Sequence, residues 1–183
     1  MTDEMVEIFS PVLNALSVIA LRSGTLLATA GSTVEIPNFQ HLLKCGESLS
    51  NVQLFPIHFL TPTTFKQDKR YVIFPQESLI LQSLISRWNV SFPEAAMDDE
   101  DAFQALLRGI HIVDYNLHTT RYPMKQVRLP AFQGRISIET RLPAPMMALW
   151  TTLYSFAPYA GIGVKTTLGM GGVSMMKASN LPV

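Results

Sequence analysis

Half of the chain's ten glycines fall in one short segment near the C-terminus, Gly161 to Gly172, which reads GIGVKTTLGMGG. Glycine adopts backbone angles that other residues avoid and lets a ligand approach the main chain. Successive N–H groups in such a turn can form an anion-binding nest. Lys165 adds a positive charge, and Thr166 and Thr167 add hydroxyl donors. The segment therefore predicts a sharply turning connection that can bind a phosphate.

The glycine segment does not match either of two common phosphate-binding motifs. A Walker-type P-loop needs Gly-Lys-Ser/Thr at its end and follows a strand, whereas Val164 precedes Lys165 and the segment follows a helical pattern. A dinucleotide-binding fingerprint places its glycines between a strand and a helix, the reverse of the order here. The composition also allows a purely structural loop, in which the glycines serve only to form tight turns.

The formal net charge of zero conceals an uneven distribution. Residues 1–101 carry six Lys/Arg against twelve Asp/Glu, and residues 102–183 carry eight Lys/Arg against two Asp/Glu. A basic half on a neutral chain fits a polyanionic partner, and it also fits a solvated face that complements the acidic half.

Several classes of protein are disfavoured by composition. No apolar run approaches the roughly 20 residues that a membrane span needs, and the acidic N-terminus does not resemble a secretory signal. The single cysteine, Cys45, suits a reducing cytosol. No pair of the four histidines has a metal-ligand spacing, so we expect neither a metal nor a cofactor.

The periodicity of apolar residues predicts the order β, β, α, β, β, α, β from about residue 54. The acidic run at 97–103 is expected to be a solvated loop. This order indicates an α+β sandwich of the ferredoxin-like (RRM-like) type, with a sheet on one face and helices on the other. The expected strands are 52–60, 71–74, 110–124, 134–142 and 172–177, and the expected helices are 76–88 and 146–156.

Two separated blocks of sequence resemble one known family. Residues 149–173, LWTTLYSFAPYAGIGVKTTLGMGGV, are similar to the C-terminal signature of the CRISPR-associated endoribonucleases that process precursor crRNA, within the RAMP superfamily. The earlier block, FLTPTTF at 59–65, then Phe74-Pro75, Ser83-Leu84 and Arg87-Trp88-Asn89, resembles the stretch that opens the family's second ferredoxin-like domain. The resemblance covers roughly residues 57–177.

The resemblance implies two ferredoxin-like domains that bind CRISPR repeat RNA. It also implies metal-independent cleavage in which a 2′-hydroxyl attacks the phosphate and leaves a 2′,3′-cyclic phosphate. Such a reaction needs a general base, a general acid and positive charge beside the phosphate. Lys165, Thr166 and Thr167 carry over as RNA contacts, as do the backbone N–H groups of Gly161, Gly163, Gly169 and Gly171.

The four histidines differ in their sequence context. His41, in NFQHLLKCG, is the weak candidate for a catalytic group, and His58 fits a structural place in an apolar strand. His111 and His118, seven residues apart, would project to opposite faces of a regular strand. His118, before two threonines and an arginine, is the better RNA contact.

Basic residues on the predicted β-rich stretch have Tyr122 and Phe132 interleaved with them, which is a pattern that can follow phosphates and stack on bases. They also fit solvent-facing strand positions. The candidates are Arg121, Lys125, Arg128, Arg135 and Arg141.

The resemblance implies that 54–183 is a complete second domain and that 1–53 is part of a first domain. The part that usually bears the catalytic histidine is not matched, so a truncated homologue, a fragment or one half of a split protein is expected. An exposed sheet edge would favour a homodimer or contact with CRISPR complex subunits. The alternatives are a non-catalytic crRNA-binding subunit and a metabolite-binding ferredoxin-like protein. A cytoplasmic prokaryotic location follows from the family.

Overall fold

The computed structural model describes residues 7–8, 11–12, 15, 18–21, 24–27, 38–124 and 127–175. The chain divides into two compact units, Met1–Ile36 and Pro37–Val183. In the first unit, β1 (Val18–Leu21) pairs antiparallel with β2 (Gly24–Leu27). The second unit begins before residue 54, since it also includes α2 (Phe39–Glu47), which packs along α5 (Ala144–Ala160).

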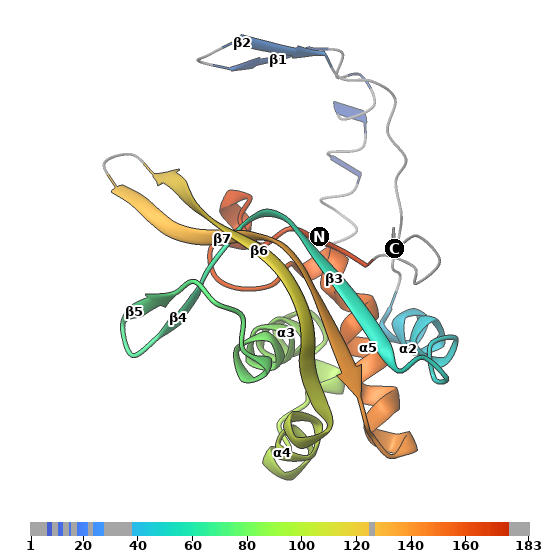
Figure 1. Cartoon of the computed structure of the whole chain (residues 1–183). Coiled ribbons are helices and arrows are strands. Elements are labelled where there is room, and N and C mark those ends of the chain that lie inside the picture. The colour runs from blue at the N-terminus through green and yellow to red at the C-terminus, as the bar shows by residue number, and fades with distance from the viewer. Residues whose placement is uncertain are drawn as a thin grey trace. The chain divides into compact units, whose positions relative to one another are not determined.

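The second unit is built on a four-stranded antiparallel sheet (Figure 1). Helix α3 (Glu77–Ser91) follows the first of these strands and α5 follows the third. The resulting order, β-α-β-β-α-β, is that of a ferredoxin-like α+β sandwich, as the sequence predicts. The strands are β3 (Leu54–Thr63), β6 (Ile110–Met124), β7 (Val127–Thr140) and β8 (Val173–Ser174), in the spatial order β6-β7-β3-β8.

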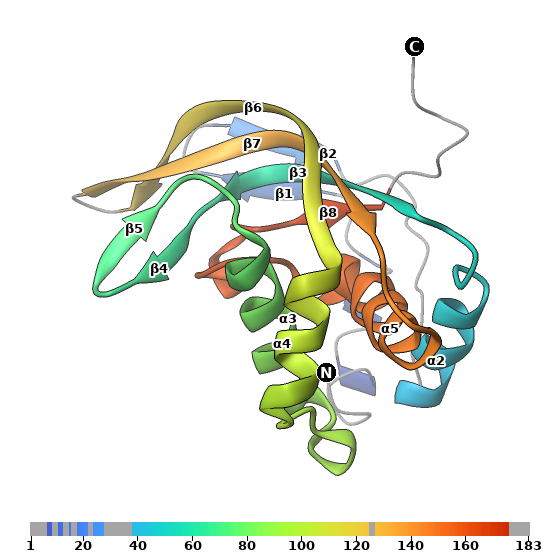
Figure 2. The same cartoon turned by 60° about the horizontal axis from the view of Figure 1, so that its bottom comes forward.

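The helices lie on one side of this sheet (Figure 2). Alternate residues of β3, Phe55, Ile57 and Phe59, are almost fully buried, as expected for one covered face of a strand. Trp88 of α3 and Trp150 of α5 are also fully buried and belong to the core. None of the helices in the described residues is long and apolar enough to cross a membrane.

Two local elements differ from the sequence prediction. The expected second strand is half of a separate hairpin, β4 (Phe65–Gln67) with β5 (Arg70–Val72), which does not join the main sheet. The acidic run opens a helix, α4 (Glu100–Gly109), after the short 3₁₀ turn η1 (Pro93–Ala95). The Asp99 carboxylate caps α4 by accepting two backbone amides, and acidic residues in a first helical turn are stabilising.

A β-bulge in β6 gives two histidines a relative orientation different from the one predicted from the sequence. The register changes between Ile112 and Asp114, which leaves Val113 without a partner on β7. One extra residue reverses the alternation of side chains along the strand. His111 and His118 therefore lie on the same face of the sheet, rather than on opposite faces.

Candidate nucleic-acid interface

The glycine segment connects α5 to β8 and contains the 3₁₀ turn η2 (Thr166–Leu168). Four of its glycine amides donate hydrogen bonds of 2.8–3.1 Å within the protein, whereas the sequence predicts that they face a phosphate. These four amides therefore already have acceptors in the folded chain. The acceptors are Ala157 O for Gly161, Ser83 Oγ for Gly163, Thr166 O for Gly169 and Pro62 O for Gly171.

Close packing accounts for the need for glycine at two of these positions. A Cβ on Gly171 would lie 2.1 Å from Ile162 O, and a Cβ on Gly163 would lie 2.6 Å from Thr64 O. Both residues also have positive φ, +70° and +94°. The segment is thus folded tightly on itself at Gly171 and against Thr64, just after β3, at Gly163, and glycine makes both approaches possible.

The two sequence blocks that carry the family resemblance contact each other directly. Ser83 of α3 accepts the Gly163 amide, and Arg87, one helical turn later, donates to the Gly163 carbonyl. From the β3–β4 side, Thr64 O accepts the Val164 amide at 3.0 Å and Thr61 Oγ1 accepts the Gly172 amide at 2.8 Å. Each block thus supplies hydrogen-bond partners for the other.

The remainder of the earlier block supports the same helix. Trp88 Nε1 donates to Ala95 O at 2.8 Å, and Asn89 Oδ1 accepts the Met97 amide at 2.8 Å. These bonds hold the connection between α3 and α4 against α3. Partial burial lowers the pKa of Arg87 by desolvation, as expected for a guanidinium that binds a backbone carbonyl beneath a loop.

We expect Arg87→Met to lower the free energy of unfolding by about 2 kcal/mol, because it leaves the Gly163 carbonyl without its charged donor. Urea denaturation measures this difference. Arg108→Met, at an exposed position of α4, is the matched control and should leave stability nearly unchanged. Equal midpoints for the two variants would contradict the structural role of Arg87.

Lys165 has a left-handed backbone, φ +60° and ψ +33°, and the 3₁₀ turn follows it directly. The Lys165 carbonyl fixes this conformation by accepting the amides of Leu168 (2.9 Å) and Met170 (3.4 Å). In the part of the chain that the structure describes, the amides of Lys165, Thr166 and Thr167 have no acceptor. A left-handed residue followed by a right-handed turn is a nest for an anion.

The β6–β7 hairpin borders this loop. The Tyr122 hydroxyl donates to the Leu168 carbonyl, and Leu129 and Ala131 of β7 pack with Met170 of the glycine segment. Lys165 and Tyr122 line one cavity. Periodicity and composition do not single out Ser83, Arg87 or Thr61 as partners of the loop. The signal that could have found them is their spacing within the earlier of the two blocks.

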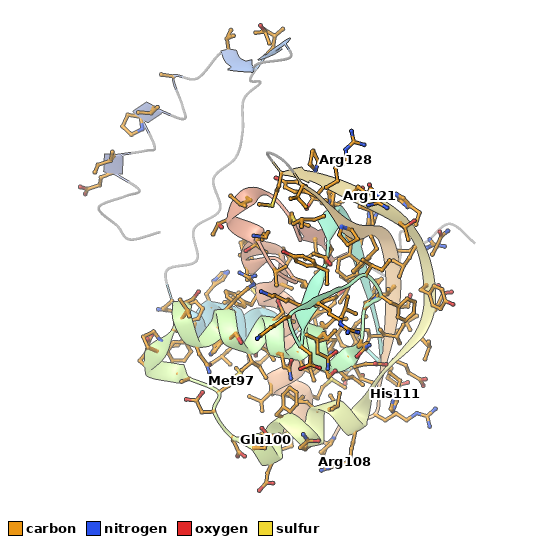
Figure 3. All side chains as sticks on the ribbon, turned by 90° about the vertical axis from the view of Figure 1, so that its left-hand side faces the viewer. Met97, Glu100, Arg108, His111, Arg121 and Arg128 are labelled. Carbon is orange, nitrogen blue, oxygen red and sulfur yellow. The ribbon has the colours of Figure 1, made fainter. Side chains whose placement is uncertain are left out.

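The predicted basic residues do not share one face. The register pairs Arg121 with Pro130 and Arg128 with Pro123, so both arginines lie on the face opposite Tyr122, near the hairpin end (Figure 3). His118 and Arg135 occupy the other face, where Arg135 pairs with His58 of β3. Arg121, Arg128 and His118 are exposed and Arg135 is half-buried, while Lys125 lies outside the described residues.

His41 lies exposed in the first turn of α2. Its side chain has no hydrogen-bond partner among the residues that the structure describes, and the same holds for His58, His111 and His118. Within those residues no group of three His, Cys, Asp or Glu side chains could hold a metal ion. A positioned acid–base pair is therefore not visible in this part of the chain.

Comparison with curated proteins gives the family. The family model for CRISPR-associated endoribonuclease Cas6 matches residues 57–173. A CRISPR-associated endoribonuclease Cas6 from Streptococcus thermophilus is 35% identical over 134 residues, which is 73% of this chain and 55% of that protein. The Mycobacterium tuberculosis protein of the same name is 27% identical over 123 residues, 65% of this chain and 38% of its own length. The chain thus spans about half or less of these relatives.

Solved structures agree in fold. A Cas6 product complex has a TM-score of 0.75 at 21% identity, with 96% of this chain and 74% of that chain covered. Thermus thermophilus Cas6 has a TM-score of 0.70 at 24% identity, with 92% of this chain and 70% of that chain covered. With the family-model match and the two contacting motif blocks, these findings place the chain in the CRISPR-associated endoribonuclease Cas6 family.

Proposed function

We propose that this chain binds CRISPR repeat RNA with a surface formed by the Lys165 loop and the end of the β6–β7 hairpin. The observation that carries the proposal is the hydrogen bond from Tyr122 to Leu168, which joins the hairpin to the turn that follows Lys165. The hairpin sequence contains no acidic residue between Asp114 and Glu139. A phosphate backbone that wraps around the hairpin end meets three exposed or partly exposed cations, Lys165, Arg121 and Arg128.

The groups of the loop that we propose for phosphate binding are not the glycine amides that the sequence predicts. The glycine amides are occupied, so we propose for RNA the Lys165 ammonium and the amides of Lys165, Thr166 and Thr167, which have no acceptor among the described residues. A nest that combines amide donors with a lysine suits a phosphate better than a neutral ligand.

We also propose that residues 1–53 belong to a first ferredoxin-like domain, whose helix α2 packs against α5 of the second domain. The main sheet offers an edge for a protein partner, because the long strand β6 is its outermost strand. Unpaired edges pair readily with other chains, which supports a homodimer or contact with other subunits of a CRISPR complex. One solved relative, in a partial Cas6-RT-Cas1–Cas2 complex, has a TM-score of 0.67 at 11% identity over all of this chain and 35% of that one.

We also propose that cleavage, where it occurs, proceeds by attack of the 2′-hydroxyl on the scissile phosphate. This reaction requires a general base beside that phosphate. In this chain the candidate base is His41, which is exposed and lacks an orienting partner among the described residues. A non-catalytic crRNA-binding role is the second candidate function, and it is supported by histidine side chains that have no hydrogen-bond partner among the described residues.

Incubation of the whole chain with labelled repeat RNA in EDTA tests both functions. We expect tight binding that is unaffected by EDTA. A 2′,3′-cyclic-phosphate product that disappears in His41→Ala would assign cleavage to this chain, and retention of intact RNA would assign the binding role. Failure to bind at low salt would contradict both.

A further inference from the structure

An open cavity lies between the glycine loop, the end of the β6–β7 hairpin and the β4–β5 hairpin. Its volume is about 780 Å³, which is within the range of small-molecule sites. Two tyrosine rings from different strands line it, Tyr71 of β5 and Tyr122 of β6. Lys165 is the one charged residue among the described residues that line it.

The apolar surface of this cavity is not covered by any other described part of the fold. Three large apolar or aromatic side chains that line the cavity are exposed: Tyr71 by 37%, Leu168 by 50% and Val127 by 60%. Exposed apolar surface gathered in a hollow generally marks a binding site. The hydrogen bond from Tyr122 to Leu168 O and the fixed backbone at Lys165 keep two sides of the hollow in position.

The chemistry of the lining restricts the ligand. Among the described residues that line the cavity none is acidic and few are polar, so this lining favours neither a cation nor a small polyhydroxylated metabolite. A flat aromatic group with an attached anion fits aromatic walls with one lysine. A nucleobase with its phosphate has this combination, because every base has a π-face that stacks on aromatic side chains.

We propose that the cavity takes one unpaired nucleobase of the bound RNA, with the base among Tyr71, Tyr122 and Leu168 and its phosphate at Lys165. A base within a duplex is stacked between its neighbours and cannot enter, so the site selects a single-stranded nucleotide. This inference rests on the proposed RNA-binding function and adds to it the class of nucleotide that the loop recognises.

The test uses the whole chain and two short oligonucleotides whose flanking positions are all abasic, one with a central 2-aminopurine nucleotide and one that is abasic throughout. We expect the abasic oligomer to bind about tenfold more weakly, because base–aromatic stacking is lost. The 2-aminopurine fluorescence should be quenched on binding. Tyr71→Ala should abolish both the affinity difference between the two oligomers and the fluorescence quenching, and Tyr71→Phe should keep both.

Tyr115→Ala is the matched control, since Tyr115 is a more exposed tyrosine that does not line the cavity, and it should behave as wild type. Equal binding of the two oligomers by the unaltered chain would overturn the base site while leaving RNA binding in place. Failure of both oligomers to bind at low salt would overturn the proposed function and this inference together. A free nucleoside monophosphate that binds as tightly as the oligomer would also overturn it.

Discussion

Replacement of Gly171 with alanine is expected to lower the free energy of unfolding by about 3 kcal/mol or more. The added Cβ would lie 2.1 Å from the Ile162 carbonyl oxygen, and the residue has φ +70°. Relief of the clash requires movement of the strand-like contact in which Ile162 N donates to Gly171 O at 2.8 Å. Urea denaturation followed by circular dichroism measures the loss.

Gly169→Ala separates the two causes of that loss. Gly169 also has positive φ, +86°, but a Cβ there would meet nothing within 4 Å. Only the backbone cost of about 1–2 kcal/mol is therefore expected. Similar losses in the two alanine variants would show that packing between Gly171 and Ile162 is not what fixes the segment.

The second large effect is on RNA affinity. A variant with Lys165→Gly, Arg121→Ala and Arg128→Ala is expected to bind repeat RNA about 100-fold more weakly at low salt, because three phosphate contacts are lost. Glycine is chosen at position 165 because the backbone there is left-handed, so the ammonium is removed without strain. Filter binding measures affinity, and a thermal melt checks that the variant remains folded.

The control for this experiment removes the same charge elsewhere. Lys44, Arg108 and Arg141 are exposed at other places on the second unit, and their joint replacement with alanine changes the net charge equally. Arg141 is a candidate RNA contact by sequence, but it follows the end of β7 that lies away from the hairpin turn and is paired with Glu139. We expect this control to keep most of the affinity. If it loses as much as the first variant, net charge rather than a defined surface determines binding.

Local patterns are sufficient to predict the core elements of the sheet and its helices. The apolar residues that recur along 52–60 and 76–88 are short-range signals, and they correctly locate β3, α3 and the layering of helices on a sheet. The glycine segment is also located correctly as the turn from α5 to β8. These features depend on residues close together in the chain.

Features that depend on distant residues could not be predicted. The acceptors of the Gly163 and Gly171 amides come from Ser83 and Pro62, far away in sequence, so the glycines resemble phosphate ligands until their partners are known. The unpaired Val113 leaves no local signature, yet it brings His111 and His118 to one face. The start of α4 is different, because the Asp99 cap involves amides only two and three residues ahead and is therefore a local signal.

The most direct test of RNA binding by this surface is the salt dependence of its affinity for labelled repeat RNA. With three phosphates at roughly 0.7 ion each, the unaltered chain should give a slope of about −2 in log affinity against log salt concentration. The Lys165→Gly, Arg121→Ala, Arg128→Ala variant should give a much shallower slope. A slope near zero for the unaltered chain, or the same slope for both proteins, would contradict the account.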